Sequence, residues 1–327
     1  MRLNRILISR IDAIGDVTLT LPMCGYIKTL FPQSEIFFLG RNYTKAVIEA
    51  CSAVDHFVDY NSLTELSKTE QLKLVQNLSL DTCIHVFPNK YLASLFKKAQ
   101  VPFRIGTTNR WFHWFTCNTL VRLSRKRSDL HEAELNIRLL KAIGETTFPK
   151  KASLYNYYHF DRIIALPDTI KSILSDEKFN LLLHPKSHGS GKEWSLLRYK
   201  ELINLLPDER FNIIISGSEK EKALLKEWIP SIGKQVTDIS GLMSLEQLIA
   251  FISKADGLIA SGTGPLHLAA ALGIHTLGLF PDTKPIHAGR WGPIGKKAEY
   301  IESENSELDT ILASRVFQKI NKWDKNF

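Results

Sequence analysis

Short apolar runs alternate with amphipathic segments throughout the first half of the chain. Segments with helical spacing of their apolar residues, such as Val17–Leu30 and Leu130–Ile143, separate the runs. Short apolar runs are typical of buried strands, and strands that alternate with helices predict a parallel, doubly wound α/β sheet. The strands predicted in this half are Ile6–Ser9, Glu35–Leu39, Val54–Asp59, Thr82–Val86 and Phe103–Ile105.

The same alternation restarts in the second half, after the less periodic stretch Phe148–Leu166. A chain of 327 residues is long enough for two cores. We therefore expect two α/β domains with a linker in that stretch, and a ligand site in a cleft between them. The second set of predicted strands is Asn180–His184, Phe211–Ser216, Val236–Asp238, Gly257–Ala260 and His275–Phe280.

The stretch Asp256–Phe280 combines a strand, a small-residue turn at 261–264 and a helix that begins near Pro265 and can end at Gly273. Backbone N–H groups and the helix dipole at such a turn can hold a phosphate. The alternative is a tight connection whose glycines serve geometry alone. His267 lies in the first turn of this helix, as a ligand contact or as a structural histidine.

Two further loops follow predicted strands of the second half. The loop within Leu181–Trp194 is rich in glycine and serine and can receive a phosphate through its backbone and Lys192, with Lys186 as the alternative donor. In the segment 216–221, a carboxylate can accept hydrogen bonds from ribose hydroxyls, or can simply favour a helix start. Three such loops in one domain favour a nucleotide ligand.

One acidic side chain follows the first strand of the chain. Asp16 is expected near the start of the first helix, where it can cap the helix or act as a general base toward a hydroxyl nucleophile. Asp12, in the same loop, is the alternative base. The motifs DxD, HExxH, GxxxxGK[ST] and GxSxG do not occur in the sequence, which disfavours metal-dependent sugar transfer, zinc hydrolysis, P-loop chemistry and a nucleophile elbow.

The composition and the N-terminal residues predict the cellular compartment of the protein. The sequence is 44% apolar and 23% charged, which is ordinary for a soluble globular protein. Residues 1–5 lead directly into a strand-like run without a signal-peptide pattern, and no apolar run reaches the roughly 18 residues of a membrane span, so we expect a cytoplasmic protein. The scattered cysteines Cys24, Cys51, Cys83 and Cys117 are interpreted as reduced core thiols rather than a metal site.

The net charge of +8 is uneven. Residues 1–160 contain 21 Lys and Arg against 13 Asp and Glu, whereas the remainder contains 21 of each. This excess indicates contact with a polyanion or an anionic surface, or else a solubilising basic surface. No nucleic-acid recognition motif is present. The aromatic segment Trp111–Phe115 is expected to be buried, with contact to lipid headgroups as the alternative.

Several blocks run along nearly the whole chain, from ILISRIDAIGDVTLTLPM at its start to SGTGPLHLAAALG in its second half. Together these blocks resemble glycosyltransferase family 9, the heptosyltransferases of lipopolysaccharide core assembly. The resemblance implies a GT-B fold, with an acceptor domain at 1–160, a nucleotide-sugar domain at 161–305 and a final helix at 306–327 that packs back toward the first domain. It also implies that a sugar is transferred with inversion of configuration and without a metal ion or a cofactor. The most favoured donor is ADP-heptose, and the acceptor is an anionic glycolipid at the inner membrane. The blocks are ILISRIDAIGDVTLTLPM, KRSDLHEAELNIRLLKAIG, HPKSHGSGKEWSLLRYKEL, ISGSEKE, MSLEQL, SGTGPLHLAAALG and LFPDTKPIHAGRWGPIG.

The resemblance also implies residue roles. Asp16 matches the catalytic base. The charge excess of the first half, rather than a family motif, assigns the basic run of Arg122, Arg125 and Arg127 to the acidic acceptor. One position departs from the family, because Gly262 stands where an aspartate usually contacts the donor sugar. The donor can therefore be another nucleotide sugar. The alternative functions are a sugar-nucleotide epimerase or hydrolase and a binding protein without catalysis. The residues that match donor contacts are Arg10, Ser187, Lys192, Glu221, Met243, Thr263, Gly264 and His267.

Overall fold

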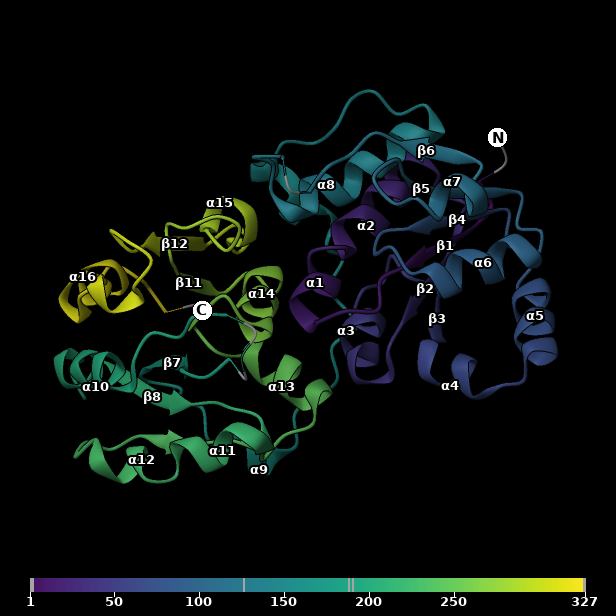
Figure 1. Ribbon diagram of the computed structural model, residues 1–327. Coiled ribbons are helices and arrows are strands. Elements are labelled where there is room, and N and C mark those ends of the chain that lie inside the picture. Colours follow the sequence, from purple (N-terminus) through teal and green to yellow (C-terminus); the bar gives the residue numbers. More distant parts are fainter. Residues whose placement is uncertain (1–2, 126, 188, 190, 326–327) are drawn as a thin grey trace. The chain divides into compact units, whose positions relative to one another are not determined.

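The computed structural model describes residues 3–125, 127–187, 189 and 191–325, and it divides into two compact units, Met1–Arg162 and Ile163–Phe327. Each unit is built on a six-stranded parallel sheet. Helices pack against both sheets (Figure 1). The α/β fold expected from the alternating pattern is confirmed, and the division falls inside the predicted linker.

The first unit has its strands in the order β3-β2-β1-β4-β5-β6. The predicted strands are all present, and the short β6 was not predicted. The strands are β1 (Arg5–Ser9), β2 (Glu35–Gly40), β3 (His56–Asp59), β4 (Thr82–His85), β5 (Phe103–Thr107) and β6 (Thr119–Val121). The helices are α1 (Ile14–Thr18), α2 (Leu21–Leu30), α3 (Lys45–Glu49), α4 (Tyr60–Glu65), α5 (Lys68–Asn77), α6 (Lys90–Lys98), α7 (His113–Thr116) and α8 (Glu132–Ile137).

The second unit has the order β12-β11-β10-β7-β8-β9, so both units share one topology with their first strand at the centre. The strands are β7 (Phe179–His184), β8 (Phe211–Ile215), β9 (Thr237–Asp238), β10 (Gly257–Ser261), β11 (His275–Phe280) and β12 (Ala298–Glu302). The helices are α9 (Asp168–Lys171), α10 (Leu196–Leu205), α11 (Glu219–Leu225), α12 (Trp228–Ser231), α13 (Leu245–Ile252), α14 (Gly264–Ala271), α15 (Ala288–Trp291) and α16 (Ala313–Ile320).

This strand order defines where a ligand can bind. The order in which successive strands are added to each sheet reverses between its first and fourth strands. This is the switch point, where doubly wound folds hold ligands at the carboxyl ends of their strands. In the first unit the switch point lies between β1 and β4, and in the second between β7 and β10. The loops after these four strands are therefore the first places to search for chemistry.

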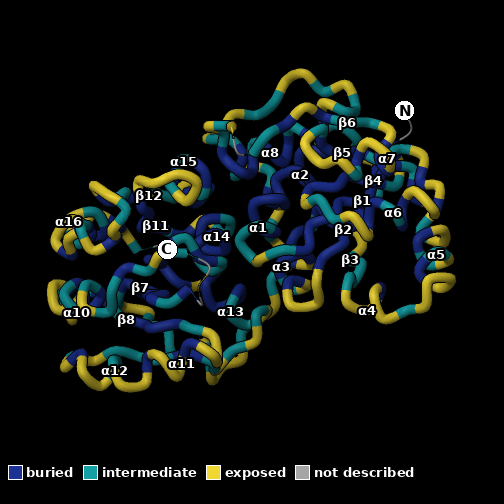
Figure 2. The backbone as a smooth tube through the Cα atoms, in the orientation of Figure 1, coloured by how far each residue is buried: buried dark blue, intermediate teal, exposed yellow. Residues whose placement is uncertain are grey.

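The central strands form the cores of the two units. Strand β1 is buried from Ile6 onward, and β7 is buried throughout. Figure 2 shows the sheets in dark blue, with exposed residues on the outer helices and loops. A run that is apolar at every position suits a parallel sheet covered on both faces, which explains why period-two alternation is missing from these strands.

Two predicted helices are interrupted. The expected helix 17–30 is split into α1 and α2, because the chain leaves regular geometry at Leu19 and restarts with Pro22 in the first turn of α2. The expected helix 130–143 begins at Glu132 and tightens into a 3-10 helix from Arg138, which ends at Gly144 with a φ of +91°. Gly144 adopts this left-handed conformation without steric cost.

The final helix, α16, was expected to pack back toward the first domain. In the structure its apolar side chains Val316 and Ile320 lie in the core of the second unit, together with Trp323. Helix α16 contacts α10 of the same unit (Figure 1). The hydrophobic face of α16 is therefore occupied within its own unit.

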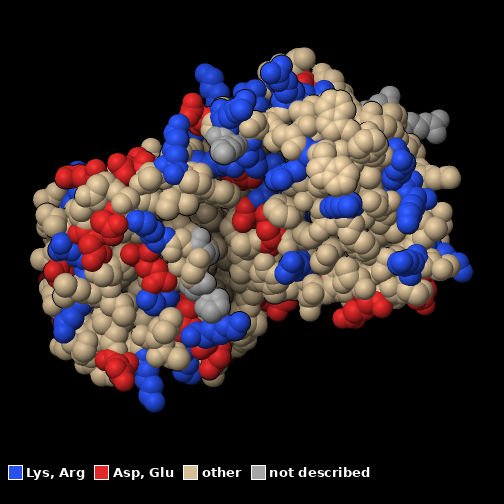
Figure 3. Space-filling model, viewed as in Figure 1, with Lys and Arg blue, Asp and Glu red and all other residues tan. Residues whose placement is uncertain are grey.

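Burial of the aromatic segment Trp111–Phe115 was a wrong prediction. Trp111, Trp114 and Phe115 expose 65%, 60% and 68% of their surface, and only His113 within the segment is fully buried. On the face seen in Figure 3, Lys and Arg are spread over the first unit, whereas both signs of charge mix on the second.

The four cysteines are buried and unpaired, as expected. Within the part of the chain that the structure describes, no helix is both long and apolar enough to cross a bilayer.

Candidate active site

The loop after β1 carries a buried arginine surrounded by acids. Arg10 is 3% exposed, and its guanidinium donates to Asp12 (Nε to Oδ1, 2.6 Å), to Glu132 (Nη1 to Oε1, 3.0 Å) and to Asp16. Burial would lower the pKa of Arg10, but the three carboxylates together raise it, so the guanidinium stays charged. Arg10 thus contributes a fixed positive charge at the switch point of the first sheet, and the three carboxylates neutralise it.

Asp16 lies in the first turn of α1, but it does not cap the helix. The N-cap position belongs to Ala13, and no side chain makes a capping hydrogen bond there. The Asp16 side chain keeps 21% of its surface exposed. Burial raises the pKa of Asp16 to about 6, although the Arg10 guanidinium opposes the shift. A partly exposed carboxylate with this pKa is suited to accept a proton near neutral pH.

Asp12, the alternative base, is held by the same arginine. Its carboxylate accepts the Arg10 Nε hydrogen bond, and its backbone carbonyl accepts a hydrogen bond from the Tyr43 hydroxyl at 2.6 Å. Asp12 and Asp16 therefore both pair with the Arg10 guanidinium, and the geometry leaves both carboxylates as candidates for the catalytic base.

Glu132 and Asn136 of α8 complete the cluster, and sequence reasoning missed both. Arg125 donates from Nε to Glu132 Oε1 at 2.8 Å and from Nη2 to Asn136 Oδ1 at 2.9 Å and to the Val86 carbonyl at 3.1 Å. Asn136 Oδ1 also lies 3.4 Å from Arg10 Nη1. The available signal was a carboxylate and an amide four residues apart on a helix that is otherwise apolar on that face.

These contacts separate the basic run into two groups. Arg125 is committed to the cluster and to the loop after β4, whereas Arg122 and Arg127 are exposed. Arg125 therefore ties together the two loops at the switch point of the first unit. Of the three arginines of the run, Arg122 and Arg127 are placed to meet a large anion from solvent.

In the second unit, the turn between β10 and α14 has the predicted form. Strand β10 ends at Ser261 and α14 begins at Gly264, with Pro265 in its first turn. Gly273 follows the helix with a φ of +79°. Thr263 occupies the N-cap position, yet its hydroxyl makes no capping hydrogen bond.

Two buried polar atoms at this turn lack partners. Among the described residues, neither Thr263 Oγ1 nor His267 Nδ1 has a hydrogen-bond partner, and each residue is 4% exposed. Burial lowers the pKa of His267 to about 4, so its imidazole is neutral at pH 7. Buried polar atoms without partners are costly, and a pair of them at a helix N-terminus fits a site that a ligand completes.

The loop after β7 lies against this turn. The Trp194 backbone N–H donates to Ser261 Oγ at 3.2 Å, and a Cβ added to Gly191 would lie 3.6 Å from the Gly262 carbonyl oxygen. The two loops of this switch point therefore touch, as strands β7 and β10 pair directly.

Glu193, which sequence reasoning did not single out, organises the loop after β7. Its carboxylate accepts hydrogen bonds from the Ser187 backbone N–H at 2.7 Å, the Ser187 hydroxyl at 2.9 Å and the Lys186 ammonium. Burial would raise the pKa of Glu193, but these donors outweigh it and lower the pKa. Lys192 instead donates to the Ser306 carbonyl at 2.7 Å and to Glu307 Oε1 at 3.1 Å. Lys192 is thus bound to the segment before α16, and Ser187 to Glu193.

The remaining predicted donor contacts follow the outer strands of the second sheet. Glu221 is buried, and its Oε2 accepts a hydrogen bond from the Ser218 backbone N–H at 2.7 Å as part of a capping box. Its other close neighbour is His184, whose Nε2 lies 3.9 Å from the same oxygen. Met243 is half-buried directly before the N-cap of α13. The helix-start interpretation of Glu221 is therefore supported directly.

A neighbouring aromatic ring limits the space for a side chain at Gly262. A Cβ at this position would lie 2.9 Å from Cε1 of Phe280, whose ring is 2% exposed at the end of β11. A side chain such as aspartate would force the ring to move. The buried aromatic ring of Phe280 thus explains the departure from the family pattern in packing terms.

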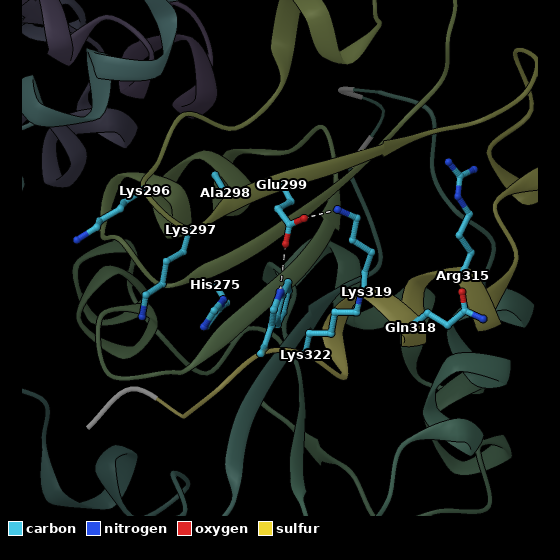
Figure 4. A pocket seen from close by; sticks show the side chains of 10 residues that line it. His275, Lys296, Lys297, Ala298, Glu299, Arg315, Gln318, Lys319 and Lys322 are labelled. Atoms are coloured by element: carbon cyan, nitrogen blue, oxygen red, sulfur yellow. Dashed lines mark hydrogen bonds and ion pairs between the residues drawn. The ribbon is translucent and has the colours of Figure 1, made fainter.

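A cavity of about 560 Å³ lies elsewhere in the second unit, at the starts of β11 and β12 (Figure 4). Glu299 in its wall accepts a hydrogen bond from Lys319 and lies 3.5 Å from Trp323 Nε1. Ligands of doubly wound sheets bind at the carboxyl ends of strands. This cavity is at the opposite ends, so it is separate from the turn at Thr263.

Comparisons with known proteins identify the family to which the chain is similar. The model of glycosyltransferase family 9 (heptosyltransferase) matches residues 73–320. A putative glycosyltransferase of Haemophilus influenzae is 27% identical over 91% of this chain and 88% of its own length. The lipopolysaccharide core heptosyltransferase OpsX of the same organism is 24% identical over 92% and 86%.

Solved structures agree on the fold. A family 9 glycosyl transferase from Veillonella parvula superposes with a TM-score of 0.81 at 18% identity, over 98% of this chain and 97% of the other. The ADP-heptose lps heptosyltransferase II of E. coli superposes with a TM-score of 0.75 at 18% identity, over 97% of each chain. The GT-B fold that the resemblance implied is confirmed.

Proposed function

Because the chain belongs to glycosyltransferase family 9, we propose that it transfers a sugar from a nucleotide-diphosphate sugar to an acceptor of the lipopolysaccharide core or lipid A type. ADP-heptose is the first donor to test, since it is named for a relative of the same fold. The observation that carries the proposal is the Arg10–Asp16 pair, a carboxylate with a pKa of about 6 beside a buried cation.

In the proposed reaction, an acceptor hydroxyl attacks the anomeric carbon of the donor from the face opposite the diphosphate. The new carbon–oxygen bond forms as the bond to the diphosphate oxygen breaks, so the configuration inverts. Asp16 takes the proton of the hydroxyl, and Arg10 keeps the carboxylate ionised until then. Asp12 is the second candidate for the base.

The departing diphosphate becomes more negative in this step, so it needs hydrogen-bond donors. The Thr263 hydroxyl, the Gly264 backbone N–H and the neutral His267 lie at one helix start, where the dipole favours an anion. Lys192 and Ser187 would join them after exchanging their present partners. These groups supply charge stabilisation from the protein alone, which supports a metal-independent mechanism without a cofactor beyond the donor.

Glu221 and Met243 are proposed to meet the ribose and the base of the nucleotide, at the loops after β8 and β9. Glu221 has one carboxylate oxygen bound to Ser218 N–H, and the other is the one we assign to the ribose. The donor sugar itself is less constrained, because Gly262 and the Phe280 ring replace a carboxylate.

On the acceptor side, we assign Arg122 and Arg127 to the phosphates and acid groups of an anionic glycolipid. Both side chains are exposed, and they belong to the unit that holds the excess positive charge. Such an acceptor is presented at the inner membrane, so we propose peripheral association of the protein with its cytoplasmic face. Arg125 stabilises the Arg10 cluster instead.

A donor screen tests the proposal. Melting temperature and sugar release are measured with ADP-heptose, UDP-sugars and GDP-sugars, because a bound donor stabilises the protein by mass action. We expect ADP-heptose to raise the melting temperature and to be consumed only when acceptor is present. A shift with UDP- or GDP-sugars alone would indicate another surface glycan.

The Asp16→Asn variant is the matched control, because Asp16 lies outside the second unit and its loss should leave the donor shift intact. Release of free sugar or of an epimer from donor alone would contradict the transferase assignment and favour a hydrolase or epimerase.

A further inference from the structure

One segment carries the entire charge excess of the chain. Residues 82–128 contain nine Lys and Arg and no Asp or Glu, which leaves 33 basic and 34 acidic residues in the rest of the sequence. The described part of this segment forms β4, α6, β5, α7 and β6, which is one edge of the first sheet together with its helices. The charged side chains that this segment contributes are therefore all basic.

The same edge exposes three large aromatic side chains at and beside α7. We call Trp111, Trp114 and Phe115 the aromatic edge, and each exposes at least 60% of its surface. The rings of Trp111 and Phe115 lie 6.5 Å apart. Clustered exposed aromatic rings are unusual on a monomeric protein and mark an interaction surface.

The aromatic edge is held outward by specific contacts. The Trp114 indole N–H donates to the Thr108 carbonyl at 2.9 Å, and Lys97 Nζ donates to the Phe115 carbonyl at 2.8 Å. Helix α6, which carries Lys97, packs beside α7. The exposed rings are therefore a built feature of this edge rather than a frayed loop.

Cations surround the rings. Lys90 lies 4.9 Å above the ring centre of Trp111, and Lys97 and Lys98 are exposed in the last turn of α6. Figure 3 shows Lys and Arg groups around a broad uncharged area over α6 and α7. Tryptophan rings settle at the headgroup level of a bilayer, and lysines beside them reach lipid phosphates.

We propose that this surface docks on an anionic lipid bilayer. The aromatic edge enters the headgroup region, while Lys90, Lys97 and Lys98 meet the phosphates of anionic lipids. Charge complementarity selects this occupant, because a segment that contributes basic but no acidic side chains attracts an anionic leaflet. The inference gives a location to the membrane association proposed above, but it does not depend on the identity of donor or acceptor.

Vesicle sedimentation of the full chain tests the proposal. We expect binding to vesicles of phosphatidylethanolamine and phosphatidylglycerol, weak binding to phosphatidylcholine alone, and release by salt. The double variant Trp111→Ala/Phe115→Ala should bind anionic vesicles about tenfold more weakly. Leu197→Ala is the matched control, since Leu197 is also 65% exposed but lies on α10, and its binding should be unchanged.

The lysines are tested in the same way. Lys90→Gln/Lys98→Gln should weaken binding several-fold, whereas Lys222→Gln/Lys226→Gln, which removes the same charge from exposed positions at α11, should not. Melting curves confirm that each variant is folded. Transfer to acceptor dispersed in detergent, without vesicles, should be retained by all four variants.

Two outcomes would overturn the proposal. One is a wild-type protein that does not sediment with anionic vesicles, and the other is binding that the aromatic variant leaves unchanged. Because the vesicles contain no acceptor and the transfer assay contains no bilayer, a failure of docking is distinguishable from a failure of the proposed activity. Loss of detergent-phase transfer in the aromatic variant would assign the aromatic edge to the acceptor instead.

Discussion

The two units share one strand order but treat their switch points in opposite ways. In the first unit, Arg10 is saturated by carboxylates at the end of β1. In the second, Thr263 and His267 are buried after β10 without hydrogen-bond partners among the described residues. At the first switch point the charged side chains are paired with one another, although Ser9 Oγ and His85 Nδ1 there also lack partners among the described residues. At the second, we propose that a ligand completes the turn. This difference suits a unit that moves a proton and a unit that binds an anion.

The largest effect is expected from Asp16→Asn. The amide cannot accept the proton, so turnover should fall by roughly a hundredfold to ten-thousandfold, the usual range for a general base. Donor affinity should stay within a factor of about two, because every residue assigned to the donor except Arg10 belongs to the second unit. Steady-state kinetics and donor titration measure the two quantities, and normal turnover together with a severe loss in Asp12→Asn would transfer the role to Asp12.

The role of Asp16 can also be tested through the pH dependence of the wild-type enzyme. Burial raises the pKa of Asp16 to about 6, and the base must be ionised to act. The wild-type kcat/KM should therefore fall as pH drops through about 6 and reach a plateau above it. A flat profile across this range, at a pH where the protein remains folded, would contradict the assignment of Asp16.

The next effect concerns the stability of the first switch point. Glu132 is 1% exposed and pairs with Arg10 and Arg125, so Glu132→Ala leaves two cations short of a partner. We expect a loss of about 3–5 kcal/mol in the free energy of unfolding, measured with urea. Glu134→Ala on the same helix removes only a capping contact and should cost about 1 kcal/mol. Equal losses in the two variants would show that the cluster adds nothing.

The smallest and most discriminating effect is expected in the second unit. Thr263→Val removes a buried hydroxyl that has no partner in the described structure, so the unliganded protein should become slightly more stable, by up to about 1 kcal/mol. Donor affinity should fall by roughly tenfold, because a hydrogen bond to a charged phosphate is lost. Melting curves with and without donor measure both changes. Lower stability with unchanged affinity would mean that Thr263 is structural.

Much of this arrangement was predictable from the chain itself. The strands that the apolar runs predicted are present in the structure, and the small residues at 261–264 form the predicted strand–turn–helix unit. Asp16 was placed in the loop after the first strand. These features depend on neighbours in sequence, which is why periodicity and turn chemistry predict them.

Other features were invisible because they depend on distant partners. Glu132 and Arg10 are 122 positions apart in the sequence, and no local pattern around either residue predicts their contact. The Phe280 ring, on a neighbouring strand, limits the space for a side chain at Gly262. Trp111 and Trp114 were expected to be buried, since aromatic residues usually are, but no element within the described ranges covers them.

The sequence by itself determined the parallel α/β architecture, the two-unit division and the identity of the loops that follow the central strands. Tertiary structure alone decided which side chains in those loops are satisfied, which are left open for a ligand and which aromatic rings face solvent. Local patterns act through the geometry of consecutive residues, whereas burial, charge pairing and pKa depend on groups that only folding brings within a few ångströms.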